Sequence, residues 1–173
     1  MTILITGGTG RTATRLAKII ADHNVPVLLT SRKGPSAVSQ PFKGVAFDWL
    51  DPATFANPFE ADHTIDRVYL VAAPSINMRP FVDFAIGKGV KRFVLLSAIL
   101  VEKGGIAHGK LHQFFEEESG LEWCVLRPST FFRESCFFGY LSSCLVSRDI
   151  QKAGLLQSSR KVTHSLQPLA MAS

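Results

Sequence analysis

A glycine-rich segment near the amino terminus contains residues whose types and spacing suit phosphate binding. Residues 6–13 read Thr-Gly-Gly-Thr-Gly-Arg-Thr-Ala, a G-x-x-G-x-x-A pattern between an apolar run and a helical pattern. Gly7 permits a tight turn, Gly10 lets backbone N–H groups approach a pyrophosphate, and the small Ala13 lets a helix pack closely on a sheet. Such a turn can be purely structural, but its position between a strand and a helix favours binding of a dinucleotide.

The residues expected to contact the cofactor phosphates belong to this turn and to the first turn of the following helix. They are Gly7, Gly8, Thr9, Gly10, Arg11 and Thr12. The amino-terminal end of a helix carries a partial positive charge, which attracts the phosphates.

The choice between NADH and NADPH is expected at the end of the second apolar run. An NAD enzyme usually has an acidic side chain there for the ribose 2′-hydroxyl, whereas this sequence reads Ser31-Arg32-Lys33. Arg32 could pair bidentately with a 2′-phosphate, Ser31 could donate a hydrogen bond to it, and Lys33 could add positive charge. The segment therefore predicts NADPH as the cofactor. The alternative, a solvated loop end, would leave the missing acid unexplained.

Further cofactor contacts are expected where other apolar runs end. Asp48 could accept a hydrogen bond from an adenine amino group, or it could start the next turn together with Asp51. Ala72 and Ala73 are small enough for their backbone to pass along the cofactor. Ser97 could contact a ribose or the substrate, or be a simple strand-end hydroxyl.

Six short apolar runs, which alternate with helical patterns, would position these residues. The runs are residues 2–6, 25–30, 45–48, 67–72, 92–97 and 122–126. This alternation predicts an α/β fold with a doubly wound parallel sheet, Rossmann-like and NAD(P)-binding, in strand order 3-2-1-4-5-6 with helices on both faces. Ligands of such sheets bind at the carboxyl ends of the strands.

Composition and charge exclude several other classes of protein. The 173 residues are 46% hydrophobic, which is enough for the core of one domain. The net charge is +5, but residues 1–146 hold 15 basic and 13 acidic side chains, so no nucleic-acid partner is expected. Three cysteines without metal-type spacing and scattered histidines predict neither disulfides nor a metal site. Without a signal-peptide pattern or a bilayer-length apolar run, we expect a cytoplasmic protein with no membrane contact.

The composition changes near residue 135. We therefore expect an NAD(P)-binding domain over residues 1–134 and an atypical, weakly structured tail over residues 135–173. The tail is rich in Ser and Gln and poor in acids, and a short helix is possible over residues 135–146. From residue 148 onward no periodicity indicates a helix or a strand.

Several segments together resemble the NmrA-like, atypical short-chain dehydrogenases, and within them the fungal ergot-alkaloid reductases of the agroclavine and festuclavine dehydrogenase type. They are residues 2–12 (Thr-Ile-Leu-Ile-Thr-Gly-Gly-Thr-Gly-Arg-Thr), 47–49 (Phe-Asp-Trp), 68–71 (Val-Tyr-Leu-Val), 89–97 (Gly-Val-Lys-Arg-Phe-Val-Leu-Leu-Ser), 109–112 (Gly-Lys-Leu-His) and 125–128 (Val-Leu-Arg-Pro). The resemblance spans about residues 1–132. It implies that hydride from NADPH reduces an iminium, formed when chanoclavine-I aldehyde cyclises, to a small-molecule clavine alkaloid.

The resemblance also implies roles for single residues. Lys110 matches the family lysine that binds the nicotinamide ribose and is the candidate catalytic residue, although an exposed helix lysine is the alternative. Carbonyl-reducing relatives have a Tyr four residues earlier, because a developing alkoxide must be protonated; here that residue is Ile106. An iminium becomes a neutral amine on accepting hydride, so the loss of the Tyr is tolerable for this substrate.

Three aromatic residues have weaker assignments. His112 lies two residues beyond Lys110 on the expected helix, so a surface or packing role is favoured over catalysis. Phe131 and Phe132 could wall an apolar pocket that favours a cationic substrate, or they could belong to the core.

The sequence departs from the family pattern in Phe131-Phe132-Arg133-Glu134-Ser135, whose last position differs from that pattern, and the similarity then fades. The family continues with a long region that contains the substrate-binding part, so we expect the fold without its usual C-terminal substrate domain. A shifted reading frame, a retained intron or a truncated gene is a hypothesis for this change. Two functions stay open: a reductase, or a non-catalytic NADP-binding, NmrA-like sensor or inactive fragment. The oligomeric state is not predicted.

Overall fold

Seven parallel strands form the central sheet in the part of the chain that the structure describes. The structure is a computed structural model, and it describes residues 1–98, 100–106, 108–128, 145 and 161–166. The strands are β1 (Thr2–Ile5), β2 (Val27–Ser31), β3 (Lys43–Ala46), β4 (Ile65–Leu70), β5 (Arg92–Leu96), β6 (Glu122–Pro128) and β7 (Lys161–Leu166). Their order in the sheet is β3-β2-β1-β4-β5-β6-β7, and every neighbouring pair is parallel.

The predicted fold is confirmed for the six predicted strands, which lie in the order 3-2-1-4-5-6. β7 adds a seventh strand beside β6, with register from Trp123↔Lys161 to Pro128↔Leu166. It lies in the segment for which the sequence predicts weak structure, so the expectation for residues 161–166 is corrected. An edge strand does not need the continuous apolar run by which buried strands are found, and this one reads Lys-Val-Thr-His-Ser-Leu. Apart from Leu145, the helix predicted over residues 135–146 lies outside the described residues.

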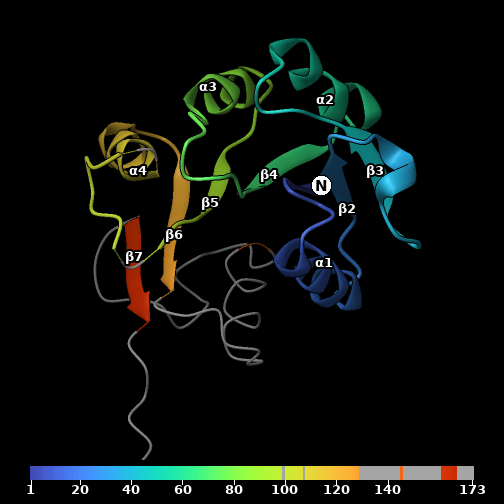
Figure 1. Cartoon of the computed structure of the whole chain (residues 1–173), viewed down its shortest axis with the longest axis horizontal. Coiled ribbons are helices and arrows are strands. Elements are labelled where there is room, and N and C mark those ends of the chain that lie inside the picture. The colour runs from blue at the N-terminus through green and yellow to red at the C-terminus, as the bar shows by residue number, and fades with distance from the viewer. Residues whose placement is uncertain (99, 107, 129–144, 146–160, 167–173) are drawn as a thin grey trace, which may run out of the picture.

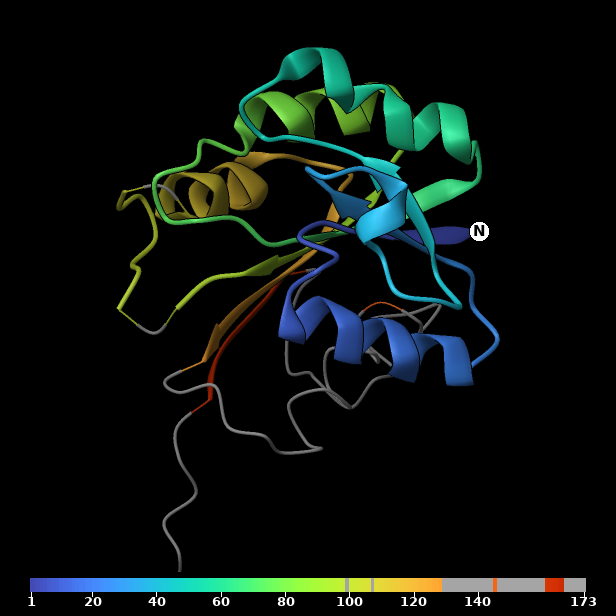
Figure 2. The ribbon, with the colours of Figure 1, turned by 45° about the vertical axis from the view of Figure 1, so that its right-hand side comes forward.

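Helices cover both faces of the sheet. The α-helices are α1 (Arg11–Asp22), α2 (Asn57–Ala61), α3 (Arg79–Gly87) and α4 (His108–Glu117), and the 3-10 helices are η1 (Pro35–Ala37) and η2 (Pro52–Phe55). Figure 1 shows α1 on one face and α2, α3 and α4 on the other, and the turned view in Figure 2 agrees. The fold is therefore a three-layer α/β sandwich in its described part.

The core is divided between the two faces, because successive strand residues point to opposite sides of the sheet. In β1, Ile3 and Ile5 pack with Leu16 and Ile20 of α1, whereas Leu4 packs into the cluster under α2, α3 and α4. The central strands are buried on both sides, which explains why they read as unbroken apolar runs.

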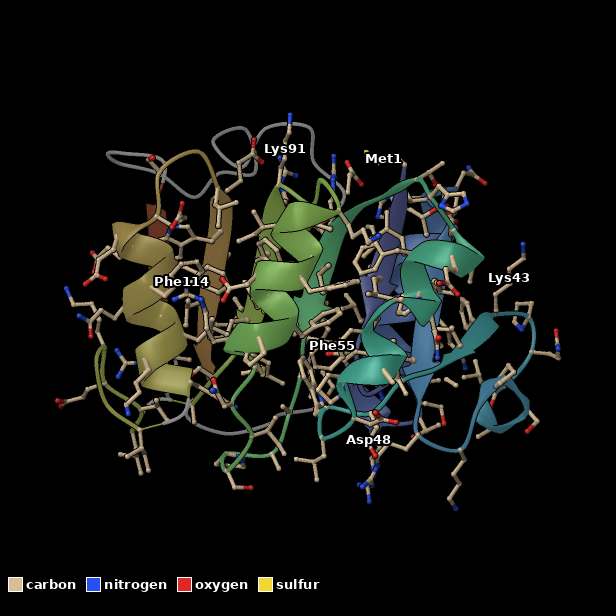
Figure 3. The ribbon with its side chains drawn as sticks, turned by 90° about the horizontal axis from the view of Figure 1, so that it is seen from above. Met1, Lys43, Asp48, Phe55, Lys91 and Phe114 are labelled. Carbon is tan, nitrogen blue, oxygen red and sulfur yellow. The ribbon has the colours of Figure 1, made fainter. Side chains whose placement is uncertain are left out.

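The carboxyl ends of the strands gather at one edge of the sheet. Figure 3 looks onto the face covered by α2, α3 and α4, with Met1 and Lys91, which precede β1 and β5, at one edge. Asp48, which follows β3, lies at the opposite edge. The polar and glycine-rich segments expected to bind the cofactor follow the strands at this opposite edge.

Candidate cofactor-binding site

The glycine-rich loop after β1 is fixed against the two neighbouring strands. The Thr6 hydroxyl donates to the Tyr69 carbonyl at 2.9 Å and accepts from the Val71 N–H at 2.7 Å, which ties the end of β1 to the end of β4. The Gly8 N–H donates to the Thr30 carbonyl at 2.8 Å. These bonds hold the loop rigidly at the carboxyl edge of the sheet.

The glycines of the loop are required by its geometry. Gly7 has φ +66°, a conformation that residues with a side chain rarely adopt. A Cβ atom at Gly8 would lie 2.7 Å from the Leu29 Cβ and 2.8 Å from the Thr30 carbonyl oxygen. Gly8 is therefore buried between the loop and β2, where the absence of a side chain lets the loop lie directly on β2.

The amino terminus of α1 follows the loop and has no side-chain cap. Gly10 is the N-cap residue, and its N–H donates to the Gly7 carbonyl at 2.8 Å. The first turn contains no acidic residue, and Arg11 and Thr12 begin the helix. Since no side chain caps the helix and no carboxylate offsets its dipole, this end of α1 is suited to an anion. Ala13 is buried, as its packing role requires.

A cavity of about 360 Å³ opens at the ends of β1, β2, β3 and β4. Eight of the residues predicted to bind the cofactor line it: Gly7, Thr9, Gly10, Ser31, Arg32, Asp48, Ala72 and Ala73. The other six, Gly8, Arg11, Thr12, Lys33, Ser97 and Lys110, do not line this cavity. The structure thus brings the glycine loop, the end of β2 and the end of β4 around one space.

The end of β2 presents a cation at the cavity. The Ser31 hydroxyl accepts the backbone N–H of Lys33 at 3.1 Å, and Gly34 turns the chain with φ +82°. Arg32 and Lys33 are exposed. Within the described ranges, no carboxylate forms an ion pair with Arg32. Its guanidinium group is therefore available to an anionic ligand in the cavity.

Asp48 forms a turn, which is one of the two roles considered for it from the sequence, and it also lines the cavity. Its Oδ1 accepts the N–H of Leu50 at 3.0 Å, and its own N–H donates to the Thr54 hydroxyl at 2.9 Å. Asp51 caps η2 by accepting the N–H of Ala53. The carboxylate of Asp48 is thus held by the turn at the cavity edge.

One wall of the cavity is apolar, and no role for its residues was predicted from the sequence. The wall consists of Phe47, Trp49, Leu50 and Ile76. The Trp49 Nε1–H donates to the Val71 carbonyl at 3.2 Å, and the Trp49 ring packs edge-to-face on Phe47 with centroids 4.9 Å apart. The Phe-Asp-Trp segment, residues 47–49, belongs to the family resemblance, and it is the sequence feature from which this wall could have been predicted.

Helix α4 lies on the same side of the sheet as α3 and carries Lys110. Lys110 is exposed, as a surface lysine would be, and its contact with the cofactor stays a prediction. His112 is 5% exposed and packs on Trp123 with ring centroids 5.6 Å apart, so it has a packing role. Ile106, four residues before Lys110, is 81% exposed. Ser97 is buried, and its N–H donates to the Leu126 carbonyl.

The structure adds His108 to the residues near the site. Its imidazole is 7% exposed and lies in hydrogen-bonding contact with the carbonyl groups of Ala73 and Ala72. Burial lowers the pKa of His108, and the carbonyl contacts oppose this effect. No local sequence pattern predicts this contact, because His108 and Ala73 are 35 positions apart and on different segments of the chain.

Other expectations concern metals, membranes and the substrate wall. Among the residues that the structure describes, no group of three or more His, Cys, Asp or Glu side chains could hold a metal ion. No helix in the same part of the chain is long and apolar enough to cross a membrane. Phe131 and Phe132 lie outside the described residues.

The fold and the cavity define a protein of the Rossmann class seen in short-chain dehydrogenases and nucleotide-sugar epimerases. The Bordetella bronchiseptica enzyme WbmG, solved with NAD, aligns with a TM-score of 0.61 at 17% identity over 74% of this chain and 53% of that chain. The Thermus thermophilus UDP-glucose 4-epimerase complex with NAD aligns with a TM-score of 0.60 at 16% identity over 74% and 55%. At these identities the likeness concerns the fold alone.

Sequence comparison is more specific, although no protein-family profile matches the chain. Agroclavine dehydrogenase from Claviceps fusiformis is 43% identical over an alignment of 139 residues, which covers 76% of this chain and 47% of that protein. Festuclavine synthase II from Penicillium roqueforti is 42% identical over an alignment of 140 residues, which covers 76% of this chain and 48% of that protein. The chain spans about half the length of these curated relatives. The resemblance to the fungal ergot-alkaloid reductases is thus confirmed: over about three quarters of its length, the chain is similar to agroclavine dehydrogenases and festuclavine synthases.

Proposed function

We propose that this chain binds NADPH and contributes to the reduction of a C=N bond, an iminium, in the formation of an ergot alkaloid. The observation that carries the cofactor assignment is the cavity itself, where the glycine loop meets Arg32 and no acidic residue ends β2. The names of the relatives, agroclavine dehydrogenase and festuclavine synthase, support the reaction class.

The described residues fit a nicotinamide dinucleotide. Gly7 to Gly10 and the uncapped end of α1 would hold the pyrophosphate, and Arg32 would pair with a 2′-phosphate. The apolar wall around Trp49 suits an adenine ring, and the end of β4 would lie along the rest of the cofactor. When bound, the cofactor supplies the hydride. The chain's own task is to bind and orient the reactants, because positioning alone can lower a barrier by several kcal/mol.

Ile106, which occupies the position of the family Tyr, is consistent with an iminium substrate. Ile106 has no group that could donate a proton to a developing oxyanion. Hydride addition to an iminium carbon turns the C=N double bond into a single bond, and the electron pair of the π bond neutralises the nitrogen. No proton donor is required for that step, so the loss of the hydroxyl favours an iminium over a carbonyl.

Binding and turnover are tested separately, because the expected substrate wall at Phe131 and Phe132 lies outside the described residues. The full chain is titrated with NADPH and with NADH by calorimetry. The complex is then mixed with chanoclavine-I aldehyde, and the absorbance of the reduced nicotinamide is followed. We expect NADPH to bind at least about tenfold more tightly than NADH, and absorbance to fall as substrate is reduced.

Each outcome has a distinct meaning. Equal affinity for the two nucleotides would contradict the role of Arg32. Tight NADPH binding without turnover would favour the second candidate, a non-catalytic NADP-binding sensor. Absence of binding to either nucleotide would contradict the proposed function as a whole.

A further inference from the structure

His108, the first residue of α4, connects this helix to the wall of the cavity. The carbonyl groups of Ala73 and Ala72 contact its ring, and both alanines line the cavity. Nε2 of the ring is buried and has no hydrogen-bond partner in the described part of the chain. We therefore assign the contacts with the carbonyls to Nδ1, the other ring nitrogen. Since burial lowers the pKa of His108, its ring is neutral at neutral pH.

The contact of His108 lies just beyond the end of β4, where the chain continues as part of the cavity wall. β4 ends at Leu70, and the Thr6 hydroxyl anchors Val71. Beyond that point Ala73 is exposed, and its carbonyl accepts the N–H of Ile76 at 2.9 Å. A carbonyl oxygen has two lone pairs, so it can accept from Ile76 and from His108 together. The ring thus ties a solvent-exposed stretch of the wall to a helix packed on the sheet.

The unpaired Nε2 indicates that stability alone does not account for a histidine here. A buried nitrogen without a partner costs free energy, which an apolar side chain of similar size would avoid. His112 provides the contrast within the same helix: it is equally buried, but it packs on Trp123 near the start of β6, at the edge opposite the cavity. Of these two histidines, only His108 contacts residues that line the cavity.

We propose that His108 is a positioning residue of the nucleotide site, which holds the Ala72–Ala73 backbone in the arrangement that a bound nucleotide requires. The inference rests on the proposed function, because the alanines matter only if the cavity binds the nucleotide. It assigns His108 no part in the chemical step. Its effect should appear in backbone order and nucleotide affinity rather than in the stability of the fold.

The test compares His108→Leu, His108→Gln and the matched control His112→Leu, each in the full chain. Hydrogen exchange at the Ile76 amide is measured without nucleotide, and the NADPH dissociation constant is measured by calorimetry. In His108→Leu we expect exchange to rise at least about fivefold and NADPH binding to weaken about tenfold. Gln can donate an N–H to the same carbonyls, so His108→Gln should restore most of both properties. His112→Leu should leave both unchanged.

Two outcomes would overturn the inference. One is unchanged exchange and affinity in His108→Leu; the other is an equal change in His112→Leu, which would indicate a general loosening of α4. If the unaltered chain bound neither nucleotide, the proposed function would fail together with the nucleotide role of His108. Exchange at Ile76 would still decide whether the ring orders the Ala72–Ala73 backbone, so the two failures are distinguishable.

Discussion

We propose that Arg32, a single exposed side chain, decides between two nearly identical cofactors. NADPH differs from NADH by a phosphate on the ribose, and a guanidinium group at the end of β2 can form two charge-assisted hydrogen bonds to it. Arg32 lines the cavity, whereas its neighbour Lys33 does not. Substitutions of Arg32 and Lys33 can therefore distinguish a specific contact with the phosphate from a general effect of positive charge.

Replacement of Arg32 by Ala should weaken NADPH binding and leave NADH binding nearly unchanged. Loss of a charge-assisted contact costs about 1.5–3 kcal/mol, so the NADPH dissociation constant should rise about 10–100-fold. Calorimetric titration of both nucleotides measures the effect. Lys33→Ala is the matched control and should change the affinity less. A ratio of the two affinities that stays constant in Arg32→Ala would place the selectivity elsewhere.

At the scale of elements, the loop between β1 and α1 depends on direct contact with β2. Gly8→Ala should destabilise the protein, because the new Cβ would clash with Leu29 and Thr30. Overpacking of this kind costs about 1–3 kcal/mol. Urea denaturation measures the change in the free energy of unfolding.

Gly87 is the control for this substitution. It is the last residue of α3, and a Cβ there would meet no atom within 4 Å. Gly87→Ala should be neutral or stabilising by up to about 1 kcal/mol. If Gly8→Ala proved equally harmless, the loop would not rest on β2 as described.

The elements also show what can be read from a sequence of this kind and why. The six central strands are predictable because burial on both faces demands unbroken apolar runs. The glycine loop is predictable because backbone geometry demands specific residues. The edge strand β7 requires neither an unbroken apolar run nor specific residues for its backbone geometry, so its sequence does not predict it. The contact of His108 with Ala72 and Ala73 depends on α4 packing near the end of β4, which no local pattern encodes.

At the scale of the whole molecule, two buried histidines link stability to pH. Burial is the main cause that lowers the pKa of both His108 and His112 from the ordinary value of 6.5. Between the ordinary and the lowered value, the unfolded chain binds more protons than the folded chain, so protonation favours unfolding. The neutral rings therefore make their full contribution to the free energy of unfolding above pH 6.5, and this contribution is lost as the pH falls below that value.

The free energy of unfolding should therefore decrease as the pH falls from 7.5 to 5.5. Urea denaturation at several pH values measures the slope. His112→Phe should reduce the slope, whereas His23→Gln, at an exposed position beyond α1, should not. A slope that is identical in all three proteins would mean that the buried rings do not cause it.

The wall of the cavity comes from a single stretch of the chain, because its residues all lie between Gly7 and Ile76. The segments expected to contact the substrate come later in the sequence. In evolutionary terms, a gene could exchange or lose its downstream coding sequence while the coding sequence for the nucleotide cavity stayed the same. Related proteins could then evolve different reactions that use the same electron donor, while the segment proposed to bind the donor stays unchanged.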